Sequence, residues 1–335
     1  MRIIVPMAGM GKRMRPHTLT IPKPLVPIAG KPIVHRLVED IVAVCEEPVE
    51  EIAFIIKESF GKAVEDSLTS IAATLGAKGT IHYQEEALGT AHAILCAADA
   101  LEGNVVVAFA DTLFKADFKL DTSQEGIIWV QRVEDPSAFG VVKLSETGAI
   151  NAFVEKPESF VSDLAIIGIY YFKDGAYLKE ELQYLIDHDI KDKGEYQLTN
   201  ALENMRNKGT KFVTGQVVEW LDCGNKNATV YTNQRYLEFL REKDLIASSA
   251  KIHNSVIIPP VYIGEQVEIN NSIIGPHVSV GHQTKVADSV IKNSIIQTNT
   301  QVDSAHIANS MLGNFVVVQG KPADLSLGDY NVHKT

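Results

Sequence analysis

The chain has 335 residues, and its 31 basic against 42 acidic residues give a formal net charge of −11. Because binding to nucleic acid without sequence preference needs an extended basic surface, this charge argues against a nucleic-acid partner. We also expect no membrane partner and a cytoplasmic location, since no apolar run is long enough to span a bilayer and no signal-peptide pattern opens the chain. The 45% of hydrophobic residues predict a core large enough for an α/β domain and a smaller second domain.

A glycine loop lies close to the N-terminus. The apolar run at 3–6 predicts a buried strand, and this strand leads into a loop that contains Ala8, Gly9 and Gly11. Two glycines one residue apart let backbone N–H groups approach an anion that a Cβ would obstruct. The loop is therefore a candidate phosphate site, although glycines of this kind also occur in plain turns from a strand to a helix.

The residues after the second glycine separate this loop from two familiar phosphate motifs. Gly11-Lys12 is followed by Arg13, whereas a Walker A loop needs Ser or Thr there. Met14 stands where the dinucleotide fingerprint has its third glycine. Arg13 and Lys23 still supply fixed positive charge in an acidic chain, so we expect a local phosphate site of another kind.

Helices and short apolar strands alternate as far as about residue 157. The expected helices lie at 33–45, 62–75 and 90–98, and the expected strands at 52–56, 80–84 and 105–109. This alternation predicts right-handed βαβ units and a Rossmann-like, mostly parallel sheet in an α/β fold. Ligands gather at the carboxyl ends of such strands, so the glycine loop, the segment 84–90 and Asp111 should meet in one crevice.

Two of the segments that follow strands carry side chains suited to a nucleotide. Gln84 offers both a donor and an acceptor to the edge of a base, and Gly89 and Thr90 follow it closely. Asp111 stands at the end of a buried strand, where a carboxylate suits Mg²⁺. Taken alone, Gly89-Thr90 is also typical of a helix cap, and Asp111 of an ordinary turn.

The amino-acid sequences of these segments resemble those of the sugar-nucleotide pyrophosphorylase family, and in particular those of glucose-1-phosphate thymidylyltransferases and uridylyltransferases. The shared signature is a Gly-x-Gly-x-Arg loop followed by Pro-Lys-x-Leu, and further similar motifs lie at 84–91, 139–142, 154–157, 194–200 and 220–224. Two departures are Lys12, where the family commonly has a small hydroxyl residue, and Ala110, where it usually has glycine.

The resemblance implies a role for each motif. It makes Arg13 and Lys23 catalytic, and it makes Asp111 and Asp222 the ligands of Mg²⁺. The nucleotide-binding residues that it implies are Ala8, Gly9, Gly11, Gln84, Gly89 and Thr90. The sugar-phosphate-binding residues that it implies are Gly140, Glu155 and Lys156. Without the resemblance, Glu155-Lys156 would be typical of a solvated charge pair.

The pattern changes after residue 243. Short units with an apolar residue roughly every sixth position begin near residue 251, and they predict about four coils of a parallel β-helix. These units resemble left-handed β-helix domains. The predicted organisation is a nucleotidyltransferase domain at 1–243, a left-handed β-helix at 251–322 and a C-terminal tail at 323–335, with a homo-oligomer formed through the β-helix.

The function that the resemblance implies is the transfer of a nucleotidyl group from an NTP to a sugar 1-phosphate, which gives an NDP-sugar and pyrophosphate. Glucose 1-phosphate with dTTP or UTP is the leading hypothesis. One alternative is a bifunctional enzyme whose β-helix also acylates a sugar with a histidine as base, and the candidates are His253, His277, His282 and His306. Another is a non-catalytic regulatory homologue, although both aspartates and Arg13 are retained. The coils lack a long inserted loop that would cover a pantetheine arm, which argues against acyl transfer.

Overall fold

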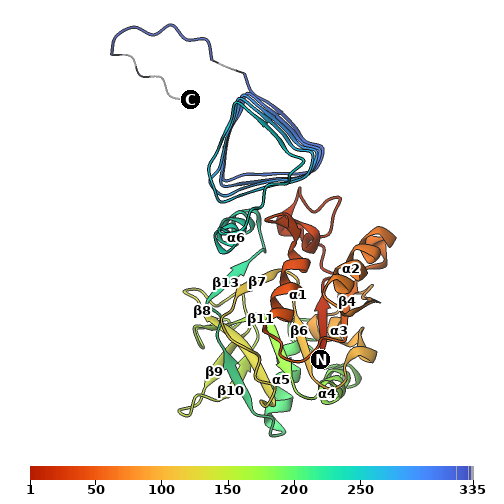
Figure 1. The fold of residues 1–335 in the computed structure, drawn as a ribbon. Helices are drawn as coiled ribbons and strands as arrows, with labels where there is room; N and C mark the ends of the chain where they lie inside the picture. Colours follow the sequence, from red (N-terminus) through yellow and green to blue (C-terminus); the bar gives the residue numbers. More distant parts are fainter. Residues whose placement is uncertain (322, 331, 333–335) are drawn as a thin grey trace. The chain divides into compact units, whose positions relative to one another are not determined.

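The structure, a computed structural model, describes residues 1–321, 323–330 and 332, and the chain divides into two compact units (Figure 1). The first unit contains residues 1–26 and 31–228, and the second contains residues 27–30 and the chain from Thr229 onward. The predicted end of the β-helix at 322 and the predicted tail residues 331 and 333–335 lie outside the described residues.

The first unit is built on one large sheet. Its strand order is β10-β9-β11-β6-β1-β4-β5, and β8 is hydrogen-bonded to both β11 and β12. The strands are β1 (Arg2–Pro6), β4 (Glu51–Ile56), β5 (Lys78–Tyr83), β6 (Val105–Ala108), β8 (Gly126–Arg132), β9 (Val141–Leu144), β10 (Ile150–Val154), β11 (Leu164–Phe172) and β12 (Phe212–Gly215). The neighbours β6, β1, β4 and β5 are parallel, which confirms the parallel core that the alternation predicted. The sheet continues with antiparallel pairs, because β11 runs opposite to both β6 and β8.

Helices cover this sheet, and both of its faces are apolar. The α-helices are α1 (Ile33–Val44), α2 (Lys62–Thr74), α3 (Thr90–Leu95), α4 (Gly175–Asp187), α5 (Leu198–Asn207) and α6 (Lys226–Phe239), which crosses from the first unit into the second. Short 3₁₀ helices are η1 (Lys12–Met14), η2 (Lys23–Leu25), η3 (Glu58–Phe60) and η4 (Ala98–Ala100). Ile4 of β1 belongs to a core cluster with α3, α4 and α5, while Ile3 and Val5 are buried on the opposite face, as alternation along a strand requires. The predicted helix at 90–98 ends earlier, at Leu95, because the chain tightens into the 3₁₀ turn η4.

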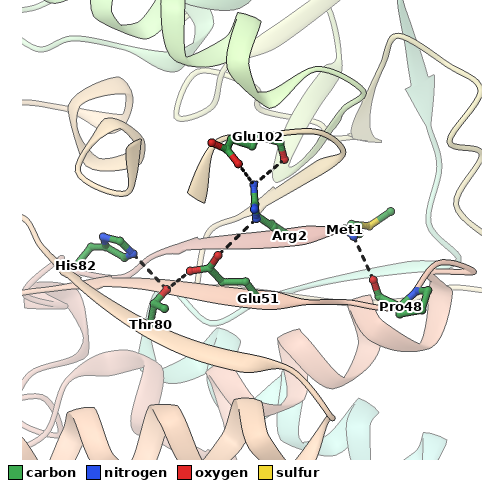
Figure 2. Close-up of polar contacts among 7 residues, drawn as sticks. All are labelled: Met1, Arg2, Pro48, Glu51, Thr80, His82 and Glu102. Carbon is green, nitrogen blue, oxygen red and sulfur yellow. Dashed lines mark hydrogen bonds and ion pairs between the residues drawn. The ribbon is translucent and has the colours of Figure 1, made fainter. Parts of the chain in front are cut away.

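A polar network holds the amino end of β1 against its neighbours (Figure 2). Arg2 lies between two carboxylates, 3.5 Å from Glu51 of β4 and 2.9 Å from Glu102. Thr80 of β5 donates a 2.7 Å hydrogen bond to Glu51, and His82 lies 3.2 Å from Thr80. Burial lowers the pKa of His82. These contacts tie three parallel strands together at one end of the sheet, and the other end is left for the loops that follow the strands.

A separate two-stranded ribbon lies near the carboxyl ends of the parallel strands. It consists of β7 (Thr112–Lys115) and β13 (Glu219–Asp222), which run antiparallel with Asp222 opposite Thr112. The backbone N–H of Cys223 donates to the Asp111 carbonyl at 2.9 Å. This pairing joins two segments that are more than a hundred positions apart in the sequence.

The second unit contains a parallel β-helix of three sheets, which Figure 1 draws as a triangular prism. Its five-stranded sheet contains β14 (Lys251–His253), β17 (Glu268–Asn270), β20 (Lys285–Ala287), β23 (Gln301–Asp303) and β26 (Val317–Gln319). The first four-stranded sheet contains β15 (Val256–Ile257), β18 (Ile273–Ile274), β21 (Val290–Lys292) and β24 (His306–Ala308). The second contains β16 (Val261–Ile263), β19 (Val278–Val280), β22 (Ser294–Ile296) and β25 (Met311–Leu312). The predicted hexad rhythm is confirmed, since its apolar residues fill the interior of the coils.

The corners of the β-helix explain why short polar residues recur between the strands. Asn254, Asn271 and Asp288 all have positive φ, a conformation that Asn and Asp tolerate better than most residues. Their side chains form a ladder, with bonds of 2.7 Å from Asn254 to Asn271 and 3.2 Å from Asn271 to Asp288. The short strands β2 (Pro27–Ile28) and β3 (Lys31–Pro32) precede α1. In the part of the chain that the structure describes, no helix is both long and apolar enough to cross a membrane.

Candidate active site

The glycine loop lines a first cavity of about 260 Å³ at the carboxyl ends of the parallel strands. Gly11 has φ of 56°, and a Cβ there would lie 2.8 Å from the Lys23 Cβ, so a larger residue does not fit. The Thr18 hydroxyl donates to the Gly11 carbonyl at 2.8 Å and fixes the turn. Of the predicted nucleotide-binding residues, all six line this cavity: Ala8, Gly9, Gly11, Gln84, Gly89 and Thr90.

Gln84 follows β5 and is largely buried in the wall of the first cavity. Its side-chain nitrogen donates to the Gly89 carbonyl at 3.3 Å and lies 3.2 Å from His92 Nδ1. Burial lowers the pKa of His92, which favours the neutral imidazole as the acceptor. These contacts orient the amide, so Gln84 is positioned to present its carbonyl oxygen to a ligand.

Gly89 and Thr90 connect the start of α3 to the start of α5. Gly89 has φ of 117°, and a Cβ there would lie 2.4 Å from the Tyr196 carbonyl oxygen. The Thr90 hydroxyl donates to Gln197 Oε1 at 3.1 Å and accepts from the Leu198 N–H at 2.8 Å. The close approach that glycine allows here is therefore to the backbone of residue 196, and the resemblance alone did not indicate this contact.

Asp111 and Asp222 are brought together by the β7–β13 ribbon. Asp222 Oδ1 accepts a 2.8 Å hydrogen bond from the Gly224 N–H. Burial raises the pKa of Asp222, and the negative charge of Asp111 raises it further. Lys23 Nζ lies 2.8 Å from Asp111 Oδ2. The two predicted metal ligands thus share one small region with a lysine that partly offsets their charge.

Arg13, in η1, reaches the same region. A Cβ on Gly224 would lie 2.9 Å from Asp222 Oδ1 and 3.3 Å from Arg13 Nη2, so both side chains border this glycine. The positive charges of Lys23 and Arg13 both act to lower the pKa of Asp222, although burial outweighs them. Both predicted catalytic cations therefore lie beside the predicted metal ligands.

A second cavity, of about 300 Å³, contains the predicted sugar-phosphate residues Gly140, Glu155 and Lys156. Glu155 and Lys156 directly follow β10, and their side chains form an ion pair of 3.2 Å. Glu155 also accepts a 3.1 Å hydrogen bond from the Thr199 hydroxyl. Lys156 has φ of 38°, a left-handed backbone conformation that is uncommon for lysine.

The two cavities share part of their walls. Thr90, Phe109, Asp111 and Glu195 line both of them. Asp111 therefore stands at the boundary between the cavity of the glycine loop and the cavity of Glu155 and Lys156. A molecule in one cavity and a molecule in the other would meet beside Asp111.

Several residues that line the second cavity were not assigned a role from the sequence. Phe139 and Trp220 pack edge to face with ring centroids 5.3 Å apart. Trp220 Nε1 is buried and has no hydrogen-bond partner among the described residues, which makes it an available donor. Glu195 accepts a 2.9 Å hydrogen bond from Gln197. The motifs at 194–200 and 220–224 pointed to these segments, but nothing in the sequence singled out the aromatic side chains.

The donor set of this region fits a magnesium ion. Carboxylate oxygens are the ligands that Mg²⁺ prefers, and it is usually bound by one or two carboxylates together with substrate phosphates and water. Asp111 and Asp222 supply two such carboxylates, and Asp222 is a half-buried group whose charge needs compensation. Among the described residues, no cluster of three or more His, Cys, Asp or Glu side chains forms a complete protein cage for a metal ion.

Comparisons with known proteins identify the family of the chain. The sequence pattern of the nucleotidyl transferase family matches residues 3–238. The chain belongs to this family. A second pattern, the GlmU-like C-terminal hexapeptide, matches residues 240–302.

Among the relatives is the catalytic subunit beta of mannose-1-phosphate guanylyltransferase from Drosophila pseudoobscura pseudoobscura, which is 33% identical over 95% of this chain and 86% of its own length. The bifunctional protein GlmU of Methanococcus maripaludis is 30% identical over 77% of this chain. The chain spans only 59% of the length of that GlmU relative.

Solved structures resemble the fold of this chain. UDP-glucose pyrophosphorylase complexed with UDP-glucose has a TM-score of 0.58 and 25% identity, and the match covers 71% of this chain and 98% of that one. A putative glucose-1-phosphate thymidylyltransferase from Bacillus anthracis has a TM-score of 0.58 and 23% identity, with 69% of this chain covered and 93% of that one. The family match over residues 3–238 and the curated relatives confirm the predicted family.

Proposed function

We propose that the chain transfers a nucleotidyl group from an NTP in the first cavity to a sugar 1-phosphate in the second. The observation that carries this proposal is the position of Asp111 at the boundary of both cavities. An anionic oxygen of the sugar phosphate attacks the α-phosphorus and forms the new O–P bond. The bond from that phosphorus to the bridging oxygen breaks, and pyrophosphate leaves with the electron pair.

This reaction needs no protein base. The second pKa of a phosphate monoester is near 6, so the attacking group is already largely dianionic at about pH 7. The contribution of the protein is then to position the two substrates and to neutralise charge. Arg13 and Lys23 would meet the phosphates, since Lys23 is paired with Asp111 and Arg13 lies beside Asp222.

Asp111 and Asp222 would hold Mg²⁺, which when bound supplies positive charge to the phosphate oxygens. Lys156 lies on the side of the second cavity and would bind the phosphate of the sugar. Its partner Glu155 offers a carboxylate to the sugar hydroxyls, and the Thr199 hydroxyl orients that carboxylate.

For the substrates, we propose glucose 1-phosphate with dTTP or UTP. The Gln84 carbonyl oxygen can accept from the ring N–H of thymine or uracil, because its amide nitrogen is held by Gly89 and His92. A second candidate pair is mannose 1-phosphate with GTP. It is favoured by the guanylyltransferase relative, whose similarity extends over 95% of this chain and so includes both units.

The β-helix gives little support to an added acyl transfer. Its strands are joined by connections of one to four residues, so no long loop is inserted between them. His277 lies 2.5 Å from a Glu238 carboxylate oxygen, and His282 Nδ1 accepts from the Glu265 N–H at 2.9 Å. Both imidazoles are thus engaged within the unit.

The experiment is a matrix of NTPs against sugar 1-phosphates, with pyrophosphate release as the readout and Mg²⁺ present or chelated. Release that requires both substrates supports the proposal, and the fastest pair decides between the two candidates. Release from NTP alone, or no release with any pair, would contradict it.

A further inference from the structure

The three outer faces of the β-helix differ sharply in what they present. The face of β16, β19, β22 and β25 is covered within the second unit. Ser279 donates to Asn233 of α6 at 2.7 Å, and the outward residues Ile295 and Met311 are buried. This face therefore has its partner already.

The face of β14, β17, β20 and β23 is polar, whereas β26, the last strand of the same sheet, carries the exposed Val317 in register with Gln301. Its outward residues include Lys251, Glu268 and Lys285, which form ion pairs of 3.3 Å and 3.7 Å along the coils. The next outward residue in the same register is Gln301. The part of this face from β14 to β23 is stable in contact with water and needs no partner.

The remaining face, of β15, β18, β21 and β24, carries an exposed apolar column. Val256, Ile273 and Val290 occupy the same register on successive coils, and Ile258 lies beside them. They are 56%, 40%, 38% and 40% exposed, respectively. Their neighbours Ile274 and Ile291 point inward and are buried, so the column is not needed to fill the core. An exposed apolar patch of this kind on a polar domain is typical of an interaction surface.

The C-terminal segment 323–332 carries a second set of exposed apolar side chains. Leu325 and Leu327 are each 53% exposed, Tyr330 is fully exposed and Val332 is 79% exposed. Each pair is two residues apart, so in an extended chain the members of a pair lie on the same side. The described part of this segment forms no helix or strand.

The segment leaves the β-helix at the end of the apolar face. In the preceding coil, β23 is followed after a two-residue corner by β24, which belongs to this face. After β26 no further strand extends that face among the described residues, and the chain continues into the segment instead. Seven residues from Gly320 to Leu327 can span roughly 23 Å, and the four strand spacings from the place beyond β24 on this face back to β15 need about 19 Å.

We propose that the apolar column is the docking site for the C-terminal segment of a second copy of this chain. The single chain leaves both surfaces open to water, and a reciprocal exchange between two copies covers both of them. Two segments and two columns related by a two-fold axis form a closed, self-complementary contact. The leucines, Tyr330 and Val332 would then lie against Val256, Ile258, Ile273 and Val290, and a C2 dimer results.

The first test measures the mass of the full-length chain by light scattering over a range of concentrations. We expect a dimer for the unaltered chain. Ile273→Glu places a charge in the contact and should raise the dissociation constant tenfold or more, while Gln301→Glu adds the same charge to the polar face and should leave it unchanged. A monomeric unaltered chain, or a dimer that Ile273→Glu does not weaken, would overturn the proposal.

The second test identifies what covers the column. Leu325→Asp with Leu327→Asp should weaken the dimer as much as Ile273→Glu does, and a dimer insensitive to this pair of changes would rule out the segment. A chain that carries Ile273→Cys and a chain that carries Leu327→Cys should form a disulfide-linked dimer only when the two are mixed. The unaltered chain is the control for disulfides formed by the natural cysteines. If a chain that carries both changes forms the bond internally and the mixture forms none, the segment docks on its own chain and the proposal is wrong.

Discussion

Lys156→Ala is the perturbation that separates the two cavities most clearly. Lys156 lines the second cavity and not the first, and its side chain forms an ion pair of 3.2 Å with Glu155. Its side chain is 47% exposed, so its removal should change the stability of the fold very little. If Lys156 binds the phosphate of the sugar, the loss should appear in the Michaelis constant for that substrate.

The size of the effect follows from the contact. A hydrogen bond to a charged group contributes about 1.5 to 3 kcal/mol. Because Lys156 is half exposed, we take the lower value, and about 1.4 kcal/mol corresponds to a tenfold change. We therefore expect the KM for sugar 1-phosphate to rise roughly tenfold. The KM for NTP should change by less than about twofold, since the NTP lies in the other cavity.

The assay is the initial rate of pyrophosphate release, with each substrate varied at a saturating level of the other. Lys143→Ala is the matched control, because Lys143 is an exposed lysine of β9 that lines neither cavity. Equal effects of Lys156→Ala on both Michaelis constants would refute the placement of the sugar phosphate. So would an effect no larger than that of Lys143→Ala.

Three further predictions concern the stability and burial of particular residues. Gly89→Ala should destabilise the protein by roughly 2 kcal/mol or more in urea unfolding, because the new Cβ would lie 2.4 Å from the Tyr196 oxygen at a φ of 117°; an unchanged midpoint would contradict this contact. The hydrogen bond from His277 lowers the pKa of Glu238 in the folded protein, so its stabilising effect is present above the pKa of the unfolded state and is lost as the pH falls through the folded pKa. The difference in thermal midpoint between the unaltered protein and Glu238→Gln should therefore shrink on acidification, and a constant difference would argue against the bond. Burial raises the pKa of Cys45 to about 11, so its alkylation at pH 8 should be far slower than that of a free thiol, and rapid modification of this residue in the folded protein would be inconsistent with that burial.

Much of the fold followed from local patterns in the sequence. The strands and helices of the parallel core lie within a few residues of the predicted ranges, since buried strands and amphipathic helices have distinct periods. The hexad rhythm predicted the β-helix for the same reason. The predicted boundary at 243 marked a change of pattern, whereas contacts group the chain from Thr229 onward with the β-helix, because α6 packs on one of its faces. Packing of that kind leaves no periodic signal.

The candidate site could be predicted only in part. The glycine loop and Asp111 follow predicted strands, so their meeting could be expected from the topology of a parallel sheet. The approach of Asp222 depends on the pairing of β13 with β7, and no spacing rule predicts a contact across more than a hundred residues. The Lys23–Asp111 ion pair and the hydrogen bond between Thr90 and Leu198 are likewise tertiary contacts between distant parts of the chain. The roles of these residues in catalysis stay predictions.

The most direct test of the account is single-turnover pyrophosphate release by Asp111→Asn and Asp222→Asn, with Asp117→Asn as the control. Asp117 is an exposed aspartate close to β7 that lines neither cavity, so its amide should retain full activity. The account predicts that each of the other two variants folds normally and loses turnover by several orders of magnitude at every Mg²⁺ concentration. Activity like that of the unaltered protein in either variant would contradict the assignment of both carboxylates to the metal and the transferred phosphate.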